Sequence, residues 1–434
     1  MSIIQFSMEE VRCFAERQEF NIRPLTFLVG ENSTGKTTAL ACFQVLSDYL
    51  IDGGINFNSP PYSMGIFRDI VRNSRKTEKV FTLGVTNGDV GYTVEFAKKM
   101  GGVEPVVKSI TVKFTDGEIV IRASNTMGDR MRLTSCDKAQ NQYHIDVRSE
   151  ALDIYPPRDL LEDFKRGWHE LSEDEKALRD YLEKTEISWR WWHGDNVFVC
   201  NTAPIRTQPK RTYNPTRQFY DPEGSHVPMW FMETKATEKE EWETLKDQLV
   251  EFGKRSGLFQ NIDINNLGGA RGNPFQLKVT VRGPNSNIVD VGYGVSQILP
   301  ILARVLEYPV FRRGTGGILH IGPMPVSLLQ QPEVHLHPRA QAELSSLLAT
   351  LACEGNRAFI VETHSDYMID RVRVEIRKGT IHPEYVSLIN LEPKGNVVKV
   401  HNISFDNMGN MENVPPHYRE FFLNETDRFM GFED

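Results

Sequence analysis

The sequence predicts an α/β fold with a mixed sheet, an antiparallel β lobe and a helical insertion. Short apolar runs typical of strands alternate with segments of helical spacing before about residue 125 and again after about 275. Between these halves the chain is strongly charged, and its apolar residues recur every three or four positions. We therefore expect an N-terminal half of the core over 1–150, a helical and loop-rich insertion over 151–274, and a C-terminal half over 275–434.

The composition is that of a globular protein with a sizeable core. Hydrophobic residues make up 40% and charged residues 25% of the 434 residues. The net charge of −8 argues against nucleic-acid binding over the whole surface, although a local basic patch remains compatible with it. No apolar run approaches the roughly 18 residues of a membrane span, and the start lacks a signal-peptide pattern. The five cysteines are scattered, so we expect reduced thiols and a cytoplasmic protein.

The N-terminal half is expected to begin with strands and one long helix. The first 30 residues predict a strand pair with its turn near Glu16–Glu19, followed by a buried strand from Leu25 to Val29. Residues 36–50 have apolar positions at helical spacing and stop before a glycine pair. β-rich runs over 80–123, separated by Asn-Gly and Gly-Gly turns, predict an antiparallel meander.

Charged helices are predicted within the insertion. Residues 158–186 have three-four apolar spacing, and Ser172 with Glu175 fits a capping box, which indicates two helices. Another helix is expected to begin at Thr237, after a stretch over 200–230 rich in Pro, Arg and Tyr. The C-terminal half is expected to contain strand 275–282, helix 296–307, strand 326–330, helix 339–353, strand 358–362 and a β-rich tail.

Residues 30–37 read GENSTGKT and match the phosphate-binding P-loop pattern, G-x-x-x-x-G-K-[ST]. The motif follows a buried strand and opens a helix, which is the context that it requires. Gly30 and Gly35 allow close approach of the backbone to phosphates, and the helix N-terminus adds partial positive charge. Lys36 is expected to reach the terminal phosphates and the Thr37 hydroxyl to bind Mg²⁺. The predicted nucleotide-binding residues in this loop are Gly30, Glu31, Asn32, Ser33, Thr34, Gly35, Lys36, Thr37 and Thr38.

Three later segments place polar groups at a helix start or a strand end. A glycine-rich turn, GYGVSQ over 292–297, precedes a helix and puts Ser296 at a natural N-cap position. One apolar strand ends in QQPEVHLHP over 330–338, and another ends in ETHSD over 362–366, which places His364 at a sheet edge. Each signal is weak alone, whereas their order after a P-loop is more specific.

In this order the motifs resemble the ATP-binding-cassette (ABC) ATPase heads of the SMC and RecF type. The likeness is greatest to the overcoming-lysogenization-defect-like AAA ATPases of bacterial antiphage systems, whose Pro/Arg segment is similar to APIRTQPKRTYNP over 203–215. The resemblance implies an ABC-ATPase head that forms a homodimer or larger homo-oligomer through ATP and Mg²⁺. Gly294 and Ser296 would then contact the nucleotide of the other protomer, and His364 would sense its terminal phosphate.

The strand tip at 330–331 departs from the family pattern. The family carries an acidic residue that binds Mg²⁺ through water, followed by Glu or Gln, whereas this chain has Gln330 and Gln331. Neither amide is charged or able to act as a base. Glu333 is the nearest acid, and it fits two roles, polarising the attacking water or shaping the turn. The assigned metal residues are Thr37 and Gln330, and the assigned catalytic residues are Lys36, Gln330, Gln331, Glu333 and His364.

Three explanations of the two glutamines remain open. The protein is a slow natural hydrolase, Glu333 has taken over the lost role, or Gln330 is an introduced Glu→Gln change. Nucleotide binding is expected to survive in each case, and only the rate of ATP hydrolysis differs.

Two basic segments are candidates for binding DNA. Residues 67–79 contain Arg68, Arg72, Arg75 and Lys76, and residues 206–217 contain Arg206, Lys210, Arg211 and Arg217 around Tyr213. Basic side chains beside an aromatic ring suit phosphate contact and base stacking, but they equally suit solvated faces or loops near the nucleotide. His335 and His337 lack neighbouring metal ligands in the sequence, so an inter-protomer loop is preferred to a transition-metal site.

These observations favour one function and leave an alternative. About 70 residues follow ETHSD, without the clustered acids of a nuclease, so we expect cutting or killing to require a separate effector protein. The first hypothesis is a sensor or scaffold subunit that controls this effector in antiphage defence. The alternative is a RecF- or SMC-like DNA-binding ATPase in repair, and a small-molecule kinase rests on the P-loop alone.

Overall fold

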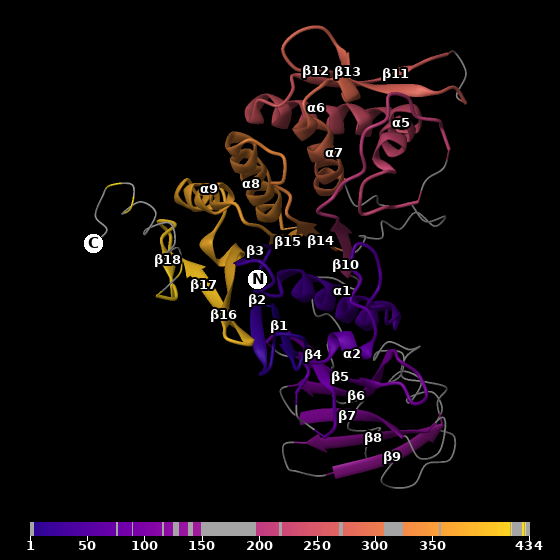
Figure 1. Ribbon diagram of the computed structural model, residues 1–434, viewed down its shortest axis with the longest axis vertical. Helices are drawn as coiled ribbons and strands as arrows, with labels where there is room; N and C mark the ends of the chain where they lie inside the picture. Colours follow the sequence, from indigo (N-terminus) through magenta and orange to yellow (C-terminus); the bar gives the residue numbers. More distant parts are fainter. Residues whose placement is uncertain are drawn as a thin grey trace.

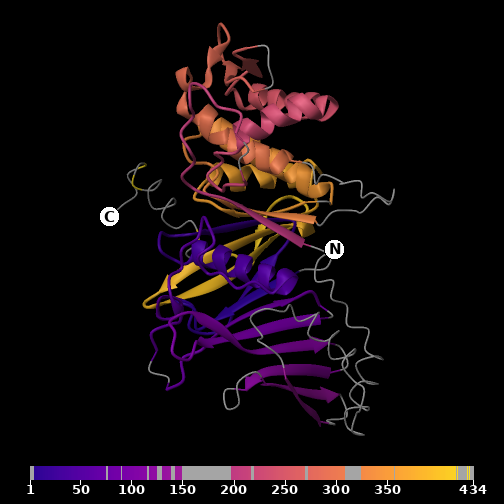
Figure 2. The same cartoon turned by 90° about the vertical axis from the view of Figure 1, so that its right-hand side faces the viewer.

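The structure of this chain is a computed structural model. It describes residues 4–74, 77–88, 90–114, 117–124, 130–137, 142–148, 197–216, 219–268, 272–307, 324–355 and 357–416, together with 418, 428 and 430. The helices expected over 158–186 lie outside these residues. Figures 1 and 2 show an elongated molecule with an antiparallel β lobe at one end, a central mixed sheet, and a helical lobe at the other end. The predicted α/β class is confirmed.

The central sheet has seven strands in the order β10-β14-β15-β3-β16-β17-β18. Its first five strands run parallel to one another, and β17 and β18 each pair antiparallel with the strand before them. The strands are β3 (Leu25–Gly30), β10 (Val197–Thr202), β14 (Met324–Gln330), β15 (Ala358–Glu362), β16 (Val386–Lys394), β17 (Val397–Phe405) and β18 (Met411–Glu412). The parallel strands read as nearly continuous apolar runs because helices cover both faces of the sheet. Their carboxyl ends meet at one edge, where α/β sheets usually bind ligands.

The two faces of this sheet pack against different helices. Phe27 of β3 packs in a cluster with residues of α7 (Tyr293–Leu306), α8 (Pro338–Cys353) and α9 (Asp366–Arg377). Its neighbour Leu28 packs in a second cluster with residues of α1 (Lys36–Asp52). This division follows from the alternation of side chains along a strand. In Figure 1, α1 and α8 accordingly lie on opposite sides of the sheet.

The antiparallel lobe is an eight-stranded sheet in the order β2-β1-β4-β5-β6-β7-β8-β9. Its strands are β1 (Ile4–Glu9), β2 (Gln18–Ile22), β4 (Phe81–Thr86), β5 (Val90–Lys98), β6 (Pro105–Phe114), β7 (Gly117–Ser124), β8 (Arg130–Asp137) and β9 (Gln142–Arg148). The meander predicted over 80–123 is confirmed, and it continues through β8 and β9. The turn predicted at Glu16–Glu19 is wrong, because β2 already begins at Gln18. Phe57, Phe81 and Phe96 pack ring against ring beneath this sheet, beside the short helix α2 (Phe67–Ile70).

The helical lobe consists of two helices, a small sheet and the start of α7. Its elements are α5 (Val227–Thr237), α6 (Lys239–Ser256), β11 (Asn261–Asn266), β12 (Phe275–Thr280), β13 (Ser286–Asn287) and the 3₁₀ turn η1 (Ile288–Asp290). Trp242, Leu245, Leu249 and Phe252 form the buried face of α6. That face belongs to the same apolar cluster as α7 and α8, so the lobe is packed directly on the central core.

Two elements differ from the sequence-based expectation. β10 falls within the range expected for the insertion, yet it pairs in parallel with β14 at the edge of the central sheet. The tail, expected to be β-rich, also contains α9, whose buried residues include Met368, Ile369, Val372 and Ile376 at helical spacing. The three-part division itself stays a prediction. Within the described part of the chain, no helix is both long enough and apolar enough to cross a membrane.

The described cysteines agree with the prediction of reduced thiols. Cys13, Cys42, Cys200 and Cys353 are free, and Cys42 and Cys200 are buried. Burial raises the pKa of the Cys42 thiol to about 12, so at neutral pH this group is an uncharged core residue.

Candidate nucleotide-binding site

The P-loop has the backbone that its glycines were expected to allow. Gly30 ends β3 with φ +139°, and Gly35 precedes α1 with φ +90°. A Cβ atom on Gly30 would lie 2.5 Å from the Leu391 carbonyl oxygen on β16. On Gly35 it would lie 2.8 Å from Cys13 Sγ and from the Phe14 ring. Both positions therefore require glycine for space as well as for dihedral angle.

Lys36 is held at the centre of the loop. Its ammonium donates hydrogen bonds to the carbonyl oxygens of Gly30 and Glu31, at 2.9 and 2.6 Å. The residue is 4% exposed, and burial lowers the pKa of its ammonium. The Thr34 hydroxyl donates to the Glu31 carbonyl at 2.9 Å. The loop therefore carries a buried positive charge where the pattern predicts phosphate contact.

The Thr37 hydroxyl contacts a carboxylate that the sequence reasoning missed. Thr37 Oγ1 lies 2.9 Å from Glu362 Oε2 and 3.0 Å from Oε1. Glu362 is the last residue of β15 and is 4% exposed. Burial raises the pKa of its carboxyl, while the Thr37 hydroxyl and the Lys36 ammonium lower it. An acid at the end of the apolar run FIVE was a visible signal, but only the strand pairing places it beside the P-loop.

Gln330 lies next to Glu362 in the sheet. The two residues are register partners of the parallel strands β14 and β15. Gln330 is 3% exposed, and its Nε2 atom has no hydrogen-bond partner among the described residues. Gln331 follows with φ +40°, and its backbone N–H donates to the Glu362 carbonyl at 2.8 Å. The described hydrogen bonds of Thr37 thus lead to Glu362 rather than to the predicted metal residue Gln330.

Glu333 connects the turn after β14 with the loop that carries His364. Glu333 Oε1 accepts a hydrogen bond from the His364 backbone N–H at 2.7 Å. Its Oε2 is buried and has no partner among the described residues. Burial raises the pKa of the Glu333 carboxyl, and burial together with Lys36 lowers the pKa of the His364 imidazole. The two roles predicted for Glu333 are compatible with this geometry, because one oxygen holds the turn and the other is free.

Arg206 is placed differently from the prediction. It is 2% exposed, so its assignment to a DNA-binding surface is wrong. Its Nη2 donates to the carbonyl oxygens of Gln330 and Gln331, at 3.3 and 3.0 Å. Its Nε and Nη1 have no partner among the described residues, and burial lowers the pKa of the guanidinium to about 10. An arginine in a loop gave no sequence signal that distinguished a solvated position from this one.

The remaining basic residues of the two segments are only partly described. Lys210 is exposed, whereas Arg211 pairs with Asp290 at 2.9 Å through Nη1 and Oδ2. Arg72 donates to the carbonyl oxygens of Arg12 and Asn396. Arg217, Arg75 and Lys76 lie outside the described residues. DNA binding through these segments stays a prediction, although the buried Arg206 is not available for it.

The glycine-rich turn at 292–297 packs against the loop after β14 in the same chain. A Cβ atom on Gly294 would lie 2.7 Å from the His335 carbonyl oxygen, and the Tyr293 ring meets the His335 ring edge-on at 4.8 Å between centroids. The N-cap predicted at Ser296 is wrong, because α7 begins at Tyr293 after Gly292. The Ser296 hydroxyl instead donates to the Tyr293 carbonyl at 2.8 Å. The contacts of Gly294 and Ser296 with another protomer stay predictions.

The two histidines of the HLH segment have local roles. The His337 side chain caps α8 by accepting from the Arg339 N–H, and His335 contacts Tyr293. Within the described residues, no group of three or more His, Cys, Asp or Glu side chains is arranged to hold a metal ion. The preference for an inter-protomer ATPase loop over a transition-metal site stays a prediction.

Part of the chain is similar to a recognised protein family. Residues 230–369, about a third of the chain, match the model of the AAA ATPase domain family. This segment extends from α5 through the turn 292–297 and β14 to the start of α9. No curated protein matches the chain.

Several solved SMC head structures are also similar, at low sequence identity. The SmcHead bound to the C-winged helix domain of ScpA has a TM-score of 0.41 and 11% identity, covering 94% of this chain and 98% of that one. The SMC head domain from Thermotoga maritima has a TM-score of 0.35 and 10% identity, covering 92% and 98%. The Smc head domain from Pyrococcus furiosus, with an extended coiled coil and bound to the C-terminal domain of ScpA, has 0.40 and 11%, covering 99% of both chains.

Residues 230–369 of the protein are therefore similar to an AAA ATPase domain, and the chain has an α/β fold with a P-loop pattern at the end of β3. The paired ends of β14 and β15 lie beside this loop.

Proposed function

We propose that the protein is an ATP-dependent switch that joins copies of itself into a homodimer or larger homo-oligomer. In this proposal it acts as the sensor or scaffold subunit that controls a separate effector in antiphage defence. The nucleotide part of the proposal is supported by the site, and the antiphage part by the order of motifs that resembles the defence ATPases. ATP and Mg²⁺ are the proposed ligands.

One observation carries the nucleotide part: charged groups from three segments meet at one sheet edge. Lys36 and Thr37 come from the P-loop, Glu362 from β15, and Glu333 from the turn after β14. Hydroxyl and carboxylate oxygens are the ligands that Mg²⁺ prefers, and such sites usually need only one or two carboxylates besides the phosphates. The residues present therefore fit a magnesium nucleotide. When bound, the ion would neutralise charge on the phosphate oxygens.

The side chains around the phosphates have distinct proposed tasks. The loop N–H groups and the start of α1 would hold the phosphates. Lys36 would exchange its bonds to Gly30 and Glu31 for the terminal phosphate oxygens. The free Oε2 of Glu333 would orient the attacking water and accept its proton, for which a raised pKa is suitable. The His364 N–H would keep the other oxygen of that carboxylate in place.

Exposed apolar side chains beside the site support assembly with a second copy. Ile205 is 79% exposed and precedes Arg206, which bonds to the tip of β14. Tyr293 is 44% exposed and contacts His335, in the loop that follows β14. Aromatic and aliphatic side chains of this kind are common in the centres of protein interfaces. Because Ile205 adjoins a residue that bonds to the end of β14 and Tyr293 contacts the loop after it, a nucleotide bound at the strand ends would control the contact.

Mass photometry with and without ATP and Mg²⁺, with phosphate release followed on the same sample, tests this proposal. We expect larger assemblies with ATP and slow phosphate release in the unaltered protein. Lys36→Ala should abolish assembly, and Gln330→Glu should raise the rate of release. Tyr293→Ala should weaken assembly, and Tyr367→Ala, at another exposed aromatic residue, is its matched control. A protein that stays monomeric at saturating ATP and copurifies with no coexpressed partner would contradict the proposal.

A further inference from the structure

We infer that Glu362 supplies the carboxylate of the magnesium site, in place of the uncharged Gln330. The inference rests on the proposed function, since it presupposes ATP at the P-loop. It differs from the assignment made from the sequence, which placed the metal at Thr37 and Gln330. Three features of the structure support it.

The first feature is the contact with Thr37. In P-loop ATPases the hydroxyl that follows the loop lysine and an acidic residue from a strand end hold the ion together. Thr37 is that hydroxyl, and both oxygens of Glu362 lie within 3.0 Å of it. The carboxylate is therefore placed to bind the ion directly or through a coordinated water.

The second feature is the strand register. Gln330 and Glu362 are paired residues of neighbouring parallel strands, so their side chains lie on the same face of the sheet. Adjacent strands are separated by only about 4.8 Å. The Gln331 N–H bonded to the Glu362 carbonyl holds the two strand ends together. A carboxylate on β15 thus reaches the same space as one on β14 would.

The third feature is the cost of burying this carboxylate. Glu362 is 4% exposed, and within the described residues its side chain accepts hydrogen bonds from the Thr37 hydroxyl alone. Lys36 influences it electrostatically but bonds to the loop carbonyls instead. A buried carboxylate with so few donors is costly, and a divalent cation would offset that cost. A side chain that only accepted the Thr37 hydrogen bond for structural reasons would not need to be charged.

Titration of a fluorescent ATP analogue in EDTA and in Mg²⁺ distinguishes a metal site from a structural contact. The unaltered protein should bind more tightly with Mg²⁺ than with EDTA. In Glu362→Gln the affinity for the analogue in EDTA should stay within about twofold of that of the unaltered protein. The Mg²⁺ gain, which is the ratio of the affinity in Mg²⁺ to the affinity in EDTA, should fall by about 10- to 100-fold, the usual effect of removing a metal-supporting group. The double variant Gln330→Glu/Glu362→Gln should recover most of the gain. Electron paramagnetic resonance of bound Mn²⁺ provides a second readout.

Glu375→Gln is the matched control. Glu375 is also a 4% exposed glutamate that accepts hydrogen bonds from hydroxyl groups, those of Ser346 and Thr380, but it lies on α9. Its replacement should leave the Mg²⁺ gain unchanged. Where Glu362→Gln alone does not fold, the double variant decides: a retained Mg²⁺ gain supports the inference, and its absence overturns it.

The outcomes separate this inference from the proposed function. An unchanged Mg²⁺ gain and Mn²⁺ spectrum in Glu362→Gln would overturn the inference while nucleotide binding stands. Equal loss of affinity in EDTA and in Mg²⁺ would reduce Glu362 to a structural support of the loop. Failure of the unaltered protein to bind the analogue under either condition would overturn the proposed function itself.

Discussion

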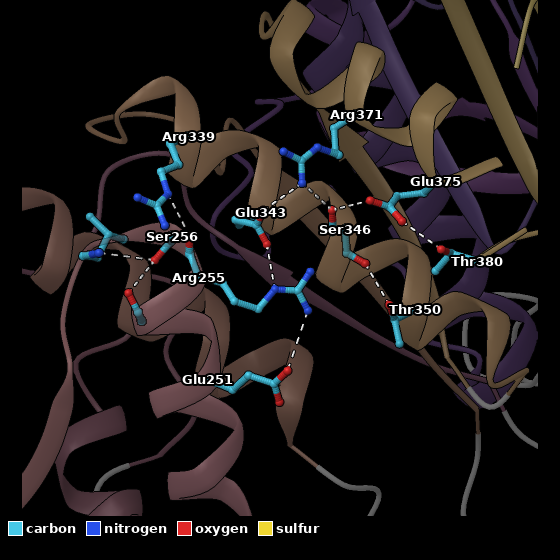
Figure 3. Close-up of polar contacts among 12 residues, drawn as sticks. Glu251, Arg255, Ser256, Arg339, Glu343, Ser346, Thr350, Arg371, Glu375 and Thr380 are labelled. Atoms are coloured by element: carbon cyan, nitrogen blue, oxygen red, sulfur yellow. Dashed lines mark hydrogen bonds and ion pairs between the residues drawn. The ribbon is translucent and has the colours of Figure 1, made fainter. Parts of the chain in front are cut away.

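Two glutamate-centred polar clusters in this protein differ in how completely their atoms are satisfied. We name the first the interhelical network, and it consists of Arg255, Glu343, Ser346, Arg371, Glu375 and Thr380. Glu343 accepts from Arg255 at 3.0 Å and from Arg371 at 2.7 Å, which joins α6, α8 and α9 (Figure 3). Ser346 and Thr380 donate to the two oxygens of Glu375 at 2.9 and 2.8 Å. Among these described residues, no buried side-chain N or O atom lacks a partner.

We name the second the sheet-edge cluster, and it consists of Thr37, Arg206, Gln330, Glu333 and Glu362. Here Arg206 Nε and Nη1, Gln330 Nε2 and Glu333 Oε2 are buried without a partner among the described residues. A buried polar atom without a hydrogen bond costs about 1–3 kcal/mol. Native structures retain few such atoms, and those that persist often have a functional role. We infer from this difference that the interhelical network stabilises the fold, and the proposed function would use the unpartnered atoms of the sheet-edge cluster to contact a ligand.

The largest difference between the two clusters is expected in nucleotide binding. Lys36→Ala removes the buried cation of the P-loop, and ATP affinity should fall by at least about 100-fold, or ~2.7 kcal/mol. The free energy of unfolding should change little, because the ammonium is desolvated and satisfied only by loop carbonyls. Nucleotide titration and urea unfolding of the same sample measure both effects. An unchanged ATP affinity in Lys36→Ala would contradict the proposal that the sheet-edge cluster, unlike the interhelical network, lies at a nucleotide-binding site.

The opposite result is expected for the interhelical network. Glu343→Ala leaves two arginines without their shared acceptor, and the free energy of unfolding should fall by about 1–3 kcal/mol. ATP affinity should be unaffected. Glu251→Ala is the matched control, because that carboxylate contacts Arg255 from a position 68% exposed, where ion pairs contribute at most about 1 kcal/mol. Similar unfolding curves for the two variants would show that the network does not stabilise the protein.

Arg206 should matter more for ATP turnover than for stability. Arg206→Met removes the donor to the Gln330 and Gln331 carbonyls but also relieves two unpartnered nitrogens. We therefore expect a stability change below about 1 kcal/mol and about a tenfold slower phosphate release, since the strand tip loses its anchor. Arg211→Met, at an exposed ion pair, is the control and should release phosphate at the normal rate. Equal rates for the two variants would contradict the positioning role.

The smallest expected effect is a pH dependence of the free energy of unfolding. The pKa of Glu375 is lowered, because hydrogen bonds from Thr380 and Ser346 and the charge of Lys378 outweigh the opposing effect of burial. A carboxyl with a depressed pKa in the folded state stabilises the protein fully at pH values above its ordinary pKa of 4.5. This stabilisation is lost as the pH falls through the folded-state pKa. The destabilisation of Glu375→Gln should therefore be largest at neutral pH and shrink below pH 4.5. Urea unfolding of both proteins across this range measures it, and a constant difference would exclude the linkage.

Several features of this protein were determined by the sequence itself. The P-loop pattern specifies its own local geometry, because its glycines and its helix start are consecutive, and Lys36 and Thr37 lie where the pattern places them. The meander over 80–123 and the helices α6, α7 and α8 followed from apolar periodicity, which reflects local side-chain direction. Glu333 was also identified from its proximity to the two glutamines.

Only the tertiary structure decided which distant residues complete the site. Glu362 follows Gln330 by more than 30 positions, and it reaches Thr37 because β15 inserts between β14 and β3. Arg206 is buried because β10 joins the sheet and brings the following loop over the tip of β14. Sequence periodicity reports which face of an element is apolar, but it does not specify which strands become neighbours. That choice depends on the free energy of packing the whole chain, and it decided that a carboxylate lies beside the P-loop although Gln330 and Gln331 carry none.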